Sequence, residues 1–375
     1  MASISISKDN KSVTVGPGAR WINVYQYLDP RGLTAIGGRV FDVGVSGLTF
    51  GGGISYFSAR YGFACDNVEE YEVVLASGAI TRASPDENKD LFFALRGGGS
   101  TNFGIVTRFK LAAYKQGNLW GGGKRYSISL NKTILEAFTK YAVNNAKDDN
   151  AHLILPFVWT KEVGYLSLAY FYYALPTPDP PIYDAFKALP SLSSTMRITN
   201  VSDVALELGS GSASGKRELF RTFTVRNDAK LFTRLLALCY DKFAPLQPKL
   251  DLITCAFQAF PANYLRGGRK NGGNALGLDP REAPLVNFNT GIMWRDAGDD
   301  EAVTRAAVEF VDEAVRLAKK MRLDHPFIYM NYAGPDQDVQ AGYGRENLRR
   351  LKNIRDKYDP DEFLRDYWPG YHKLP

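Results

Sequence analysis

The stretch GVSGLTFGGGISYFSARYGFACDN spans residues 44–67 and contains six glycines. Glycine loses more backbone freedom on folding than any other residue, so this density is costly inside a helix or strand. Gly44, Gly47, Gly51, Gly52 and Gly53 would instead expose a row of backbone amides with no Cβ in front of them. Such amides can donate to ligand oxygens, and a flat ring can lie directly on the chain. Tight turns in a crowded loop explain the same glycines equally well.

Length and composition bound the kind of protein. The chain has 375 residues, of which 45% are apolar and 23% charged, a profile typical of a globular protein with a large core and room for two domains. The formal net charge is +6, but basic and acidic residues are interleaved, as in RENLRRLKNIRDKYDPDE (345–362). Such mixing favours a solvated surface over a nucleic-acid footprint. No apolar run approaches the ~20 residues of a membrane span, so neither nucleic acid nor a membrane is an expected partner.

The cysteines and histidines do not form a recognisable pattern. Cys65, Cys239 and Cys255 are far apart in sequence and include no CxxC pair, so neither a disulfide framework nor a structural zinc site is indicated. The three histidines are equally scattered. Each is expected at the surface or in local hydrogen bonds, and no metal site is expected.

Residues 1–115 predict strands and helices in alternation. ISI (4–6) and SVTV (12–15) predict an opening hairpin, and apolar residues at helical spacing predict a helix over 21–28. VEEYEVVLASGAITRA (68–83) predicts a second hairpin. SPDENKDLFFALRGGG (84–99) predicts a helix capped by Ser84, with Pro85 at its first position. FGIVTRFKLAAY (103–114) predicts one more strand.

From about residue 116 to 325, long helical patterns alternate with aromatic-rich strands. Helices are predicted over 131–146 and 301–321, and strands over 151–160, 164–174, 250–260 and 284–294. This order predicts a large antiparallel sheet covered by helices on one side. The remainder predicts a strand PFIYMNY (326–332), an irregular loop and a helix over 345–360.

Three segments resemble one enzyme family. They are residues 37–84, beginning GGRVFDVGVSGLTFGGG, residues 88–111, and residues 329–370, beginning YMNYAGPDQD. They resemble the FAD-linked oxidases of the vanillyl-alcohol oxidase type, and more narrowly the berberine-bridge-enzyme-like group of fungal secondary metabolism. The resemblance implies an α+β fold: part of a PCMH-type FAD-binding domain (1–115), an inserted substrate domain with a large antiparallel sheet (116–325), and a berberine-bridge-like segment that returns to the FAD domain (326–375). No GxGxxG motif opens a βαβ unit, so a Rossmann fold is not expected.

The resemblance also implies where flavin and substrate bind. The loop from Val43 to Ser55 would lie along the isoalloxazine ring and ribityl chain, and residues 104–106 would clasp the adenine side. Tyr332 would project into the substrate cavity as the catalytic base, since a tyrosine beside a buried polarisable cofactor can act in acid–base chemistry. The implied cofactor contacts are Val43, Gly44, Val45, Gly47, Gly51, Gly52, Ser55, Asp66, Asn67, Gly104, Ile105, Val106 and Asn331.

Three departures from the family pattern modify these expectations. The chain has no Arg-Ser-Gly-Gly-His loop, which in the family holds the pyrophosphate and often links its histidine to the flavin, so the first subdomain of the FAD domain is expected to be missing. Val40 stands where doubly linked members have a cysteine, and Asn287 stands where plant members have an acid. FAD is therefore expected to be non-covalent or absent. Tyr332 remains the best candidate base, because an amide cannot accept a proton at useful pH.

Three explanations of the missing subdomain stay open. The chain can be a fragment or the product of a truncated gene, a complete protein that binds flavin weakly or not at all, or one part of a site that a partner chain completes. A chain without that subdomain would expose apolar surface that the subdomain covers, and is expected to be poorly stable alone.

The sequence therefore predicts an FAD-dependent oxidoreductase that acts on a small organic, secondary-metabolite substrate by hydride transfer to flavin, with molecular oxygen as electron acceptor. The alternative is an inactive relic, or a non-redox binding or cyclising protein that uses the same cavity and purifies colourless. Asn287 and Asn289 are expected to contact substrate. The strand residues that could line its cavity, although strand aromatics are more often core, are Phe157, Trp159, Tyr170, Tyr172, Phe257, Asn287 and Asn289.

Overall fold

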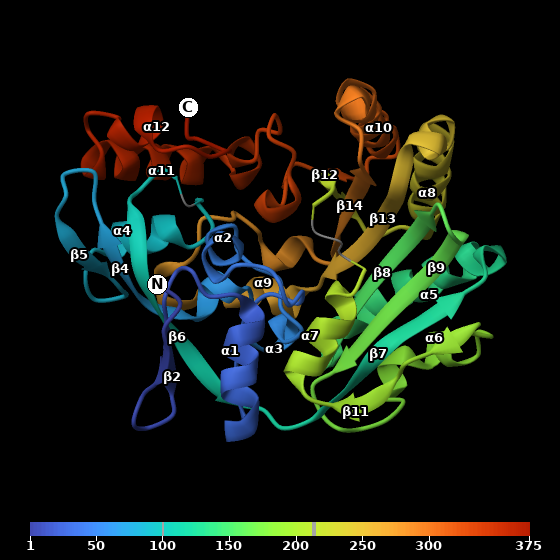
Figure 1. The fold of residues 1–375 in the computed structure, drawn as a ribbon, viewed down its shortest axis with the longest axis horizontal. Coiled ribbons are helices and arrows are strands. Elements are labelled where there is room, and N and C mark those ends of the chain that lie inside the picture. The colour runs from blue at the N-terminus through green and yellow to red at the C-terminus, as the bar shows by residue number, and fades with distance from the viewer. Residues whose placement is uncertain (100, 212–214) are drawn as a thin grey trace.

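Two antiparallel sheets form the fold in the computed structural model, which describes residues 1–99, 101–211 and 215–375. They occupy the left and right halves of Figure 1, and both chain ends lie in the left half. The six-stranded sheet has the order β1-β2-β6-β4-β5, with β3 paired to β6. Its strands are β1 (Ile4–Ile6), β2 (Ser12–Val15), β3 (Leu33–Ala35), β4 (Val68–Val74), β5 (Ile80–Ala83) and β6 (Ile105–Lys115).

The nine-stranded sheet has the order β10-β7-β9-β8-β13-β14-β12-β15, with β11 paired to β7. Its long central strands β9, β8, β13, β14 and β12 pair with one another over most of their length. The strands are β7 (Leu119–Tyr126), β8 (Ala151–Thr160), β9 (Gly164–Tyr173), β10 (Ser193–Ser194), β11 (Arg197–Thr199), β12 (Arg217–Arg226), β13 (Leu250–Phe260), β14 (Leu285–Trp294) and β15 (Asp324–His325).

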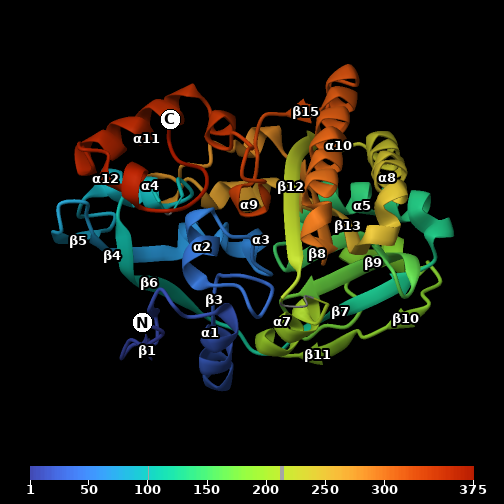
Figure 2. The same cartoon turned by 45° about the horizontal axis from the view of Figure 1, so that its top comes forward.

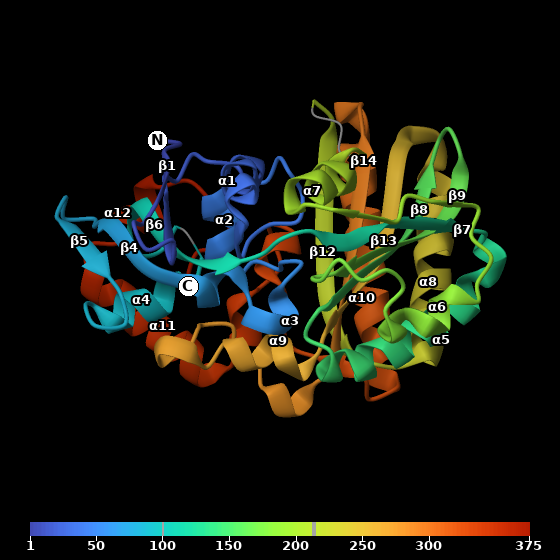
Figure 3. The ribbon, with the colours of Figure 1, turned by 90° about the horizontal axis from the view of Figure 1, so that it is seen from below.

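Long helices cover only one face of the nine-stranded sheet (Figure 3). The helices α5 (Asn131–Asn144), α8 (Ala229–Phe243) and α10 (Asp300–Lys320) share a core with the sheet in which Phe138, Phe232, Phe257, Phe288 and Phe310 are fully buried. Each buried aromatic side chain removes a large apolar area from water, so this core stabilises the half strongly. The opposite face of the sheet is left to meet the other half of the molecule.

Apart from α6, which packs against α5 in the nine-stranded half, the remaining helices belong to, or border, the six-stranded half. The C-terminal helix α11 packs against α4, which lies on the N-terminal side of the chain, and Figure 2 shows α11 and α12 grouped beside α4. No helix within the described part of the chain is both long and apolar enough to cross a membrane. These elements are α1 (Trp21–Leu28), α2 (Val45–Phe50), α3 (Ser58–Tyr61), α4 (Lys89–Leu95), α6 (Asp184–Lys187), α7 (Val201–Gly209), α9 (Ala262–Gly267), α11 (Arg345–Tyr358) and α12 (Phe363–Tyr367).

Most of the predicted elements are confirmed, and two predictions are wrong. The helix over 21–28, both hairpins, the long strands and the helices α5, α10 and α11 lie where the patterns place them. Ser84 does not cap a helix: its hydroxyl accepts from the amides of Asp86 and Glu87 in a turn, and α4 begins only at Lys89. The segment 326–332 is not a strand, because it has no strand partner and ends in a 3₁₀ turn at Met330–Tyr332.

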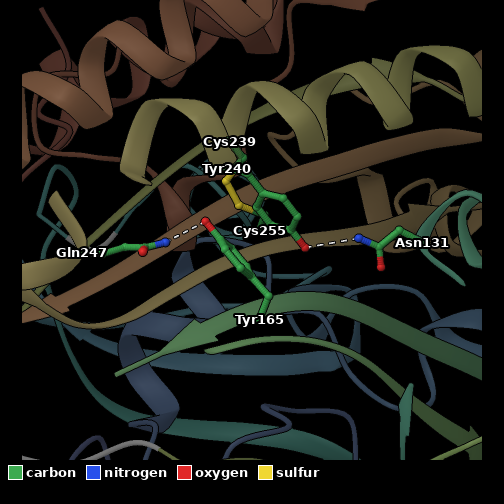
Figure 4. Close-up of a disulfide and its surroundings, with 6 residues drawn as sticks. All are labelled: Asn131, Tyr165, Cys239, Tyr240, Gln247 and Cys255. Carbon is green, nitrogen blue, oxygen red and sulfur yellow. Dashed lines mark hydrogen bonds between the residues drawn. A yellow bond between two sulfur atoms is a disulfide. The ribbon is translucent and has the colours of Figure 1, made fainter. Parts of the chain in front are cut away.

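The expectation that no disulfide forms is also wrong. Cys239 on α8 and Cys255 on β13 are bonded, beside the tilted, contacting rings of Tyr165 and Tyr240 (Figure 4). Both cysteines are fully buried where the helix packs on the strand. A sequence separation of 16 residues gives no local signal for such a pair, because it arises only when the helix docks on the sheet. Cys65 stays free and buried.

This pairing predicts a thiol count. Titration of the unfolded, unreduced protein with a thiol reagent is expected to give one reactive thiol, that of Cys65, and three after reduction. Three thiols before reduction would contradict the disulfide.

Candidate active site between the two sheets

A cavity of about 680 Å³ lies between the two halves of the molecule. One wall comes from the glycine-rich half and from the C-terminal segment, and the other is the helix-free face of the nine-stranded sheet. The volume falls within the range of about 300–1,000 Å³ that is usual for small-molecule sites. On the side of the glycine-rich half, the lining residues are Arg39, Val40, Val43, Leu48, Ile54, Tyr329, Asn331 and Tyr332.

Strand alternation decides which sheet residues reach the cavity. Even-numbered residues of 154–160, 166–170 and 252–258 and odd-numbered residues of 289–293 line it, as expected for side chains that point to opposite faces in turn. Phe157, Trp159 and Phe257 have the other parity and pack against the helices, so their prediction as lining residues is wrong. Tyr170 and Asn289 do line the cavity.

Two further predicted lining residues lie on the correct face but are covered. Tyr172 is buried between Tyr56 and His152. Asn287 is fully buried, and its amide donates to the hydroxyl of Thr222 at 2.7 Å. The expected substrate contact through Asn287 is therefore not available, and Asn289, two positions along β14, takes that place on the cavity wall.

Tyr332 is the polar focus of the cavity. Its phenol oxygen accepts a hydrogen bond of 2.7 Å from Nη2 of Arg39 and one of 3.3 Å from Nε2 of Gln258. The same Gln258 nitrogen donates to Oδ1 of Asn289 at 3.1 Å. Two donors, one of them a cation, thus converge on the phenol oxygen and hold it as a hydrogen-bond acceptor. The arrangement fixes this oxygen at the cavity wall.

Arg39 owes its position to the packing of the segment GGRVFDVG. Gly37 and Gly38 lie under the indole of Trp21, where a Cβ on Gly37 would come within 2.0 Å of the ring. The hydroxyl of Tyr25 donates to the carbonyl of Gly38 at 2.7 Å. Trp21 and Tyr25 thus fix the backbone at Gly37 and Gly38. Arg39, the next residue, lies at the boundary between the two halves with only 7% of its surface exposed.

His152 on β8 receives the other end of the guanidinium. Nη1 of Arg39 lies 3.0 Å from Nε2 of His152, and since arginine can only donate, this nitrogen must accept. The proton of the neutral ring is then on Nδ1, which is hydrogen-bonded to the hydroxyl of Tyr264. Burial, aided by the charge of Arg39, lowers the pKa of His152 well below its ordinary value. His152 is therefore a locally satisfied neutral histidine, as the sequence predicted for the histidines as a class.

Asn331 fastens the C-terminal segment to the glycine-rich loop. Its amide nitrogen donates to the carbonyl of Leu48 at 2.9 Å and to the hydroxyl of Tyr329 at 3.0 Å, and that hydroxyl also accepts from the amide of Ile54 at 3.0 Å. A Cβ on Gly51 would lie 2.1 Å from Oδ1 of Asn331. Gly51 is therefore required by the approach of this amide.

The glycine-rich stretch is only partly open. Gly52 faces Leu276, and Gly53 faces Ala64 and Leu48, both glycines having positive φ angles of 102° and 84°. The expectation that Gly51–Gly53 present a bare surface is wrong, because neighbouring side chains fill that space. Nothing lies within 4 Å of a Cβ built on Gly44 or Gly47, so the open part of the loop is its first half.

The other predicted cofactor residues are used within the protein, outside the cavity lining. Val45 is fully buried and donates its amide to Ala19, and Ser55 is buried beside Ser58. Asp66 accepts from the amide of Phe63 and from Asn274, and its burial raises the pKa of its carboxyl. Asn67 donates to the carbonyl of Phe63.

The predicted adenine contacts lie at the start of β6, the middle strand of the six-stranded sheet. Ile105 and Val106 pair with β4, and a Cβ on Gly104 would press on Val73. Of the predicted site residues, the structure thus brings Val43, Asn289, Asn331 and Tyr332 together at one cavity.

Sequence reasoning missed Arg39 and Gln258. Both carry a signal that could have been used. Arg39 is the one charged residue in an otherwise small and apolar run, AIGGRV. Gln258 interrupts the apolar strand LITCAFQAF at a position that alternation assigns to the helix-free face.

The cavity fits the flavin ring that the sequence resemblance implies. Apolar side chains of Val43, Leu48 and Ile54 border it on one side, as a flat apolar ring requires, and the loop beside them carries no side chain at Gly44 and Gly47. The amide of Asn331 and the hydroxyl of Tyr332 supply polar atoms at the same wall.

Comparison with protein families places both ends of the chain. A family described as "FAD binding domain" matches residues 1–84, and one described as "Berberine and berberine like" matches residues 328–367. These matches contain the glycine-rich loop and the segment that Asn331 and Tyr332 occupy.

Whole-chain comparison finds fungal relatives and a shared fold. The chain is 37% identical to the FAD-dependent monooxygenase tpcD of Cochliobolus heterostrophus over 100% of this chain and 74% of that protein. It is also 37% identical to the FAD-dependent monooxygenase FUP4 of Fusarium proliferatum, over 96% of this chain and 72% of that protein. The solved structure of xylooligosaccharide oxidase from Myceliophthora thermophila C1 superimposes with a TM-score of 0.80 at 20% identity, over 100% of this chain and 80% of that one, which shows a common fold.

The contact between Gly51 and Asn331 predicts a stability difference between two glycine substitutions. Gly51→Ala is expected to lower the free energy of unfolding by about 1–3 kcal/mol, because its methyl group displaces Asn331. Gly47→Ala meets open space within a helix and is expected to be neutral or stabilising by up to about 1 kcal/mol. Urea denaturation of both variants measures the difference.

The Asn331→Ala background supplies the control. There the clash is gone, so Gly51→Ala is expected to cost less than in the wild type. Equal costs for Gly51→Ala and Gly47→Ala would contradict the proposed packing.

Proposed function

The chain belongs to the FAD-linked oxidoreductase family that contains fungal FAD-dependent monooxygenases and berberine-bridge-like enzymes, and on that premise we propose that it oxidises a small organic molecule in the cavity beside Tyr332. The observation that supports this most directly is the hydrogen bond from Arg39 to the phenol oxygen of Tyr332 at the cavity wall. This hydrogen bond positions Tyr332 as a general base beside an apolar cavity, an arrangement suited to removing the proton of a substrate hydroxyl.

The residues of this chain would act in three ways. Arg39 and Gln258 donate to the phenol oxygen of Tyr332 and hold it in place. Tyr332 then accepts the proton of the substrate hydroxyl as the carbon beside it loses hydride, so that an alcohol becomes a carbonyl. The surrounding apolar residues, among them Leu166, Leu168 and Met293, exclude water and hold the rest of the substrate.

FAD supplies the hydride acceptor when it is bound, and molecular oxygen is the proposed oxidant that regenerates it. Val43, Leu48 and Asn331 are the residues of this chain that we expect to contact the ring. Val40, at the cavity wall, offers no nucleophile for a thioether. Cys65 lies outside the cavity lining, and its burial raises the pKa of its thiol well above the ordinary value, so it stays protonated. We therefore propose that FAD is held without a covalent bond to this chain.

The proposed substrate is a small, largely apolar secondary metabolite. This rests on the apolar strand residues of the cavity wall and on the fungal relatives, which are named as monooxygenases. We also propose the domain boundaries at residues 115 and 325. All strands of the six-stranded sheet lie before the boundary at residue 115, and all strands of the nine-stranded sheet lie after it.

Non-covalent attachment predicts that denaturation releases the flavin from the polypeptide into solution. Acid precipitation of FAD-saturated protein is expected to leave all flavin fluorescence in the supernatant. Flavin that stays with the precipitated polypeptide after washing would overturn the proposal of non-covalent binding.

The role of Tyr332 predicts a large kinetic effect from the loss of one hydroxyl. In anaerobic single-turnover experiments with the best substrate from a panel of aromatic primary and secondary alcohols, Tyr332→Phe is expected to slow flavin reduction by about 10²-fold or more. Substrate affinity is expected to change less than about threefold, because the ring and its stacking partner Phe220 remain.

Tyr126→Phe is the matched control. It also deletes a buried hydroxyl, which has no hydrogen-bond partner in the described structure, but lies outside the cavity lining. Flavin reduction that is equally fast in wild type and Tyr332→Phe would remove Tyr332 from the mechanism.

A further inference from the structure

We propose that the substrate carries an anionic oxygen, a phenolate, enolate or carboxylate on an apolar skeleton, and that Arg39 and Asn289 bind it. This rests on the proposed function, because it assigns the substrate class of the same cavity. The observation that leads to it is a buried cation at the cavity wall that has no carboxylate partner among the described residues.

Arg39 differs in its surroundings from the other buried arginines. Arg221 forms a two-point ion pair with Asp336, with N–O distances of 2.6 and 2.8 Å, and Arg355 pairs with Asp356. Arg96 donates to three backbone carbonyls of residues 270–273. Arg39 donates only to His152 and Tyr332, and in the described parts of the chain it forms no ion pair with an Asp or Glu.

An uncompensated charge in a buried position is costly, so its presence needs an explanation. His152 cannot supply the missing negative charge, because it is a neutral imidazole. Tyr332 can do so only while it is a phenolate. When Tyr332 is a neutral phenol, no protein partner of Arg39 carries a negative charge, and Arg39 lines a cavity that a ligand can enter.

Asn289 supplies a second donor at the same end of the cavity. Its Oδ1 accepts from Gln258, which fixes the amide orientation and leaves the Nδ2 group free to donate. No protein acceptor for that group is found among the described residues, and Asn289 lines the cavity. A guanidinium and an amide that line the same cavity can both donate to an anionic oxygen.

The other charged residues of the cavity wall do not compete for this role. Arg125 and Glu218 also line the cavity, but both are exposed. Arg125 lies on β7, which is separated from β13 by β9 and β8. Arg39 is therefore the buried cation to which the anionic oxygen of the ligand binds. The apolar remainder of the ligand then contacts the strand residues of β8, β9 and β13.

Equilibrium binding of two matched probes to the full chain tests this proposal. The probes are 2-naphthoate and its neutral isostere 2-naphthamide, measured by isothermal titration calorimetry. Wild-type protein is expected to bind the naphthoate at least tenfold more tightly. Arg39→Met is expected to lose at least tenfold in naphthoate affinity and less than threefold in naphthamide affinity, and Arg39→Lys to retain part of the preference.

Arg125→Met is the control, because it removes an equal charge from another part of the same cavity. It is expected to change naphthoate affinity less than threefold, and a larger effect than that of Arg39→Met would overturn the assignment. Equal affinity of wild type for the two probes would also overturn it, and this result needs no folded variant. If the preference for naphthoate disappears at saturating FAD, Arg39 binds an anionic group of the flavin and not of the substrate. That result would overturn the proposal that the substrate is anionic.

A chromogenic phenol reports the charge state directly. 4-Nitrophenol is expected to bind to wild type as the phenolate at a pH where it is mostly neutral in buffer, and to bind to Arg39→Met as the phenol. A bound probe that stays neutral in wild type would contradict the proposal. Neither binding measurement depends on turnover. Failure of the redox function would appear as normal flavin reduction in Tyr332→Phe, or as no flavin reduction at all. It is therefore distinguishable from failure of the anion site, which appears only in the binding of the probes.

Discussion

One buried guanidinium connects three parts of this molecule. Arg39 starts in the glycine-rich half, reaches Tyr332 in the C-terminal segment, and touches His152 on the nine-stranded sheet. Because arginine keeps its charge in proteins and has donors in a fixed fork, it sets both the protonation of its partners and their directions. The histidine becomes neutral with its proton on Nδ1, and the phenol oxygen becomes an acceptor. The boundary between the halves thus acquires its polarity from a single side chain.

The nine-stranded sheet gives the cavity a second property, a wall made largely of apolar side chains. The helices α5, α8 and α10 take one set of alternating side chains into a closed aromatic core, so the other set must face the N-terminal half. Gln258 and Asn289 are the polar members of that second set at the end near Arg39. In the proposed function, chemistry and binding therefore share one end of the cavity, while the rest of the wall offers apolar contact.

Local pattern predicted most of the elements, and contacts between distant segments account for what it did not predict. The helix at 21–28 and the long strands follow from spacing alone. The positions of Arg39, Gln258 and Asn331 depend on pairings across 293, 74 and 283 residues, respectively, which no local pattern contains. The segment 326–332 has strand composition but becomes a turn, because Tyr329 and Asn331 bind the glycine-rich loop. The Cys239–Cys255 bond and the occupied space beside Gly51 have the same origin, since each arises only when two elements dock.

If the cavity beside Arg39 and Tyr332 is the redox site of this FAD-linked enzyme, a crystal structure of the chain grown with saturating FAD will show the flavin there. Electron density for the isoalloxazine ring is expected inside this cavity, in contact with Val43 and Leu48 and on the same side as Tyr332. A ring bound elsewhere on the chain, with this cavity filled only by solvent, would contradict it.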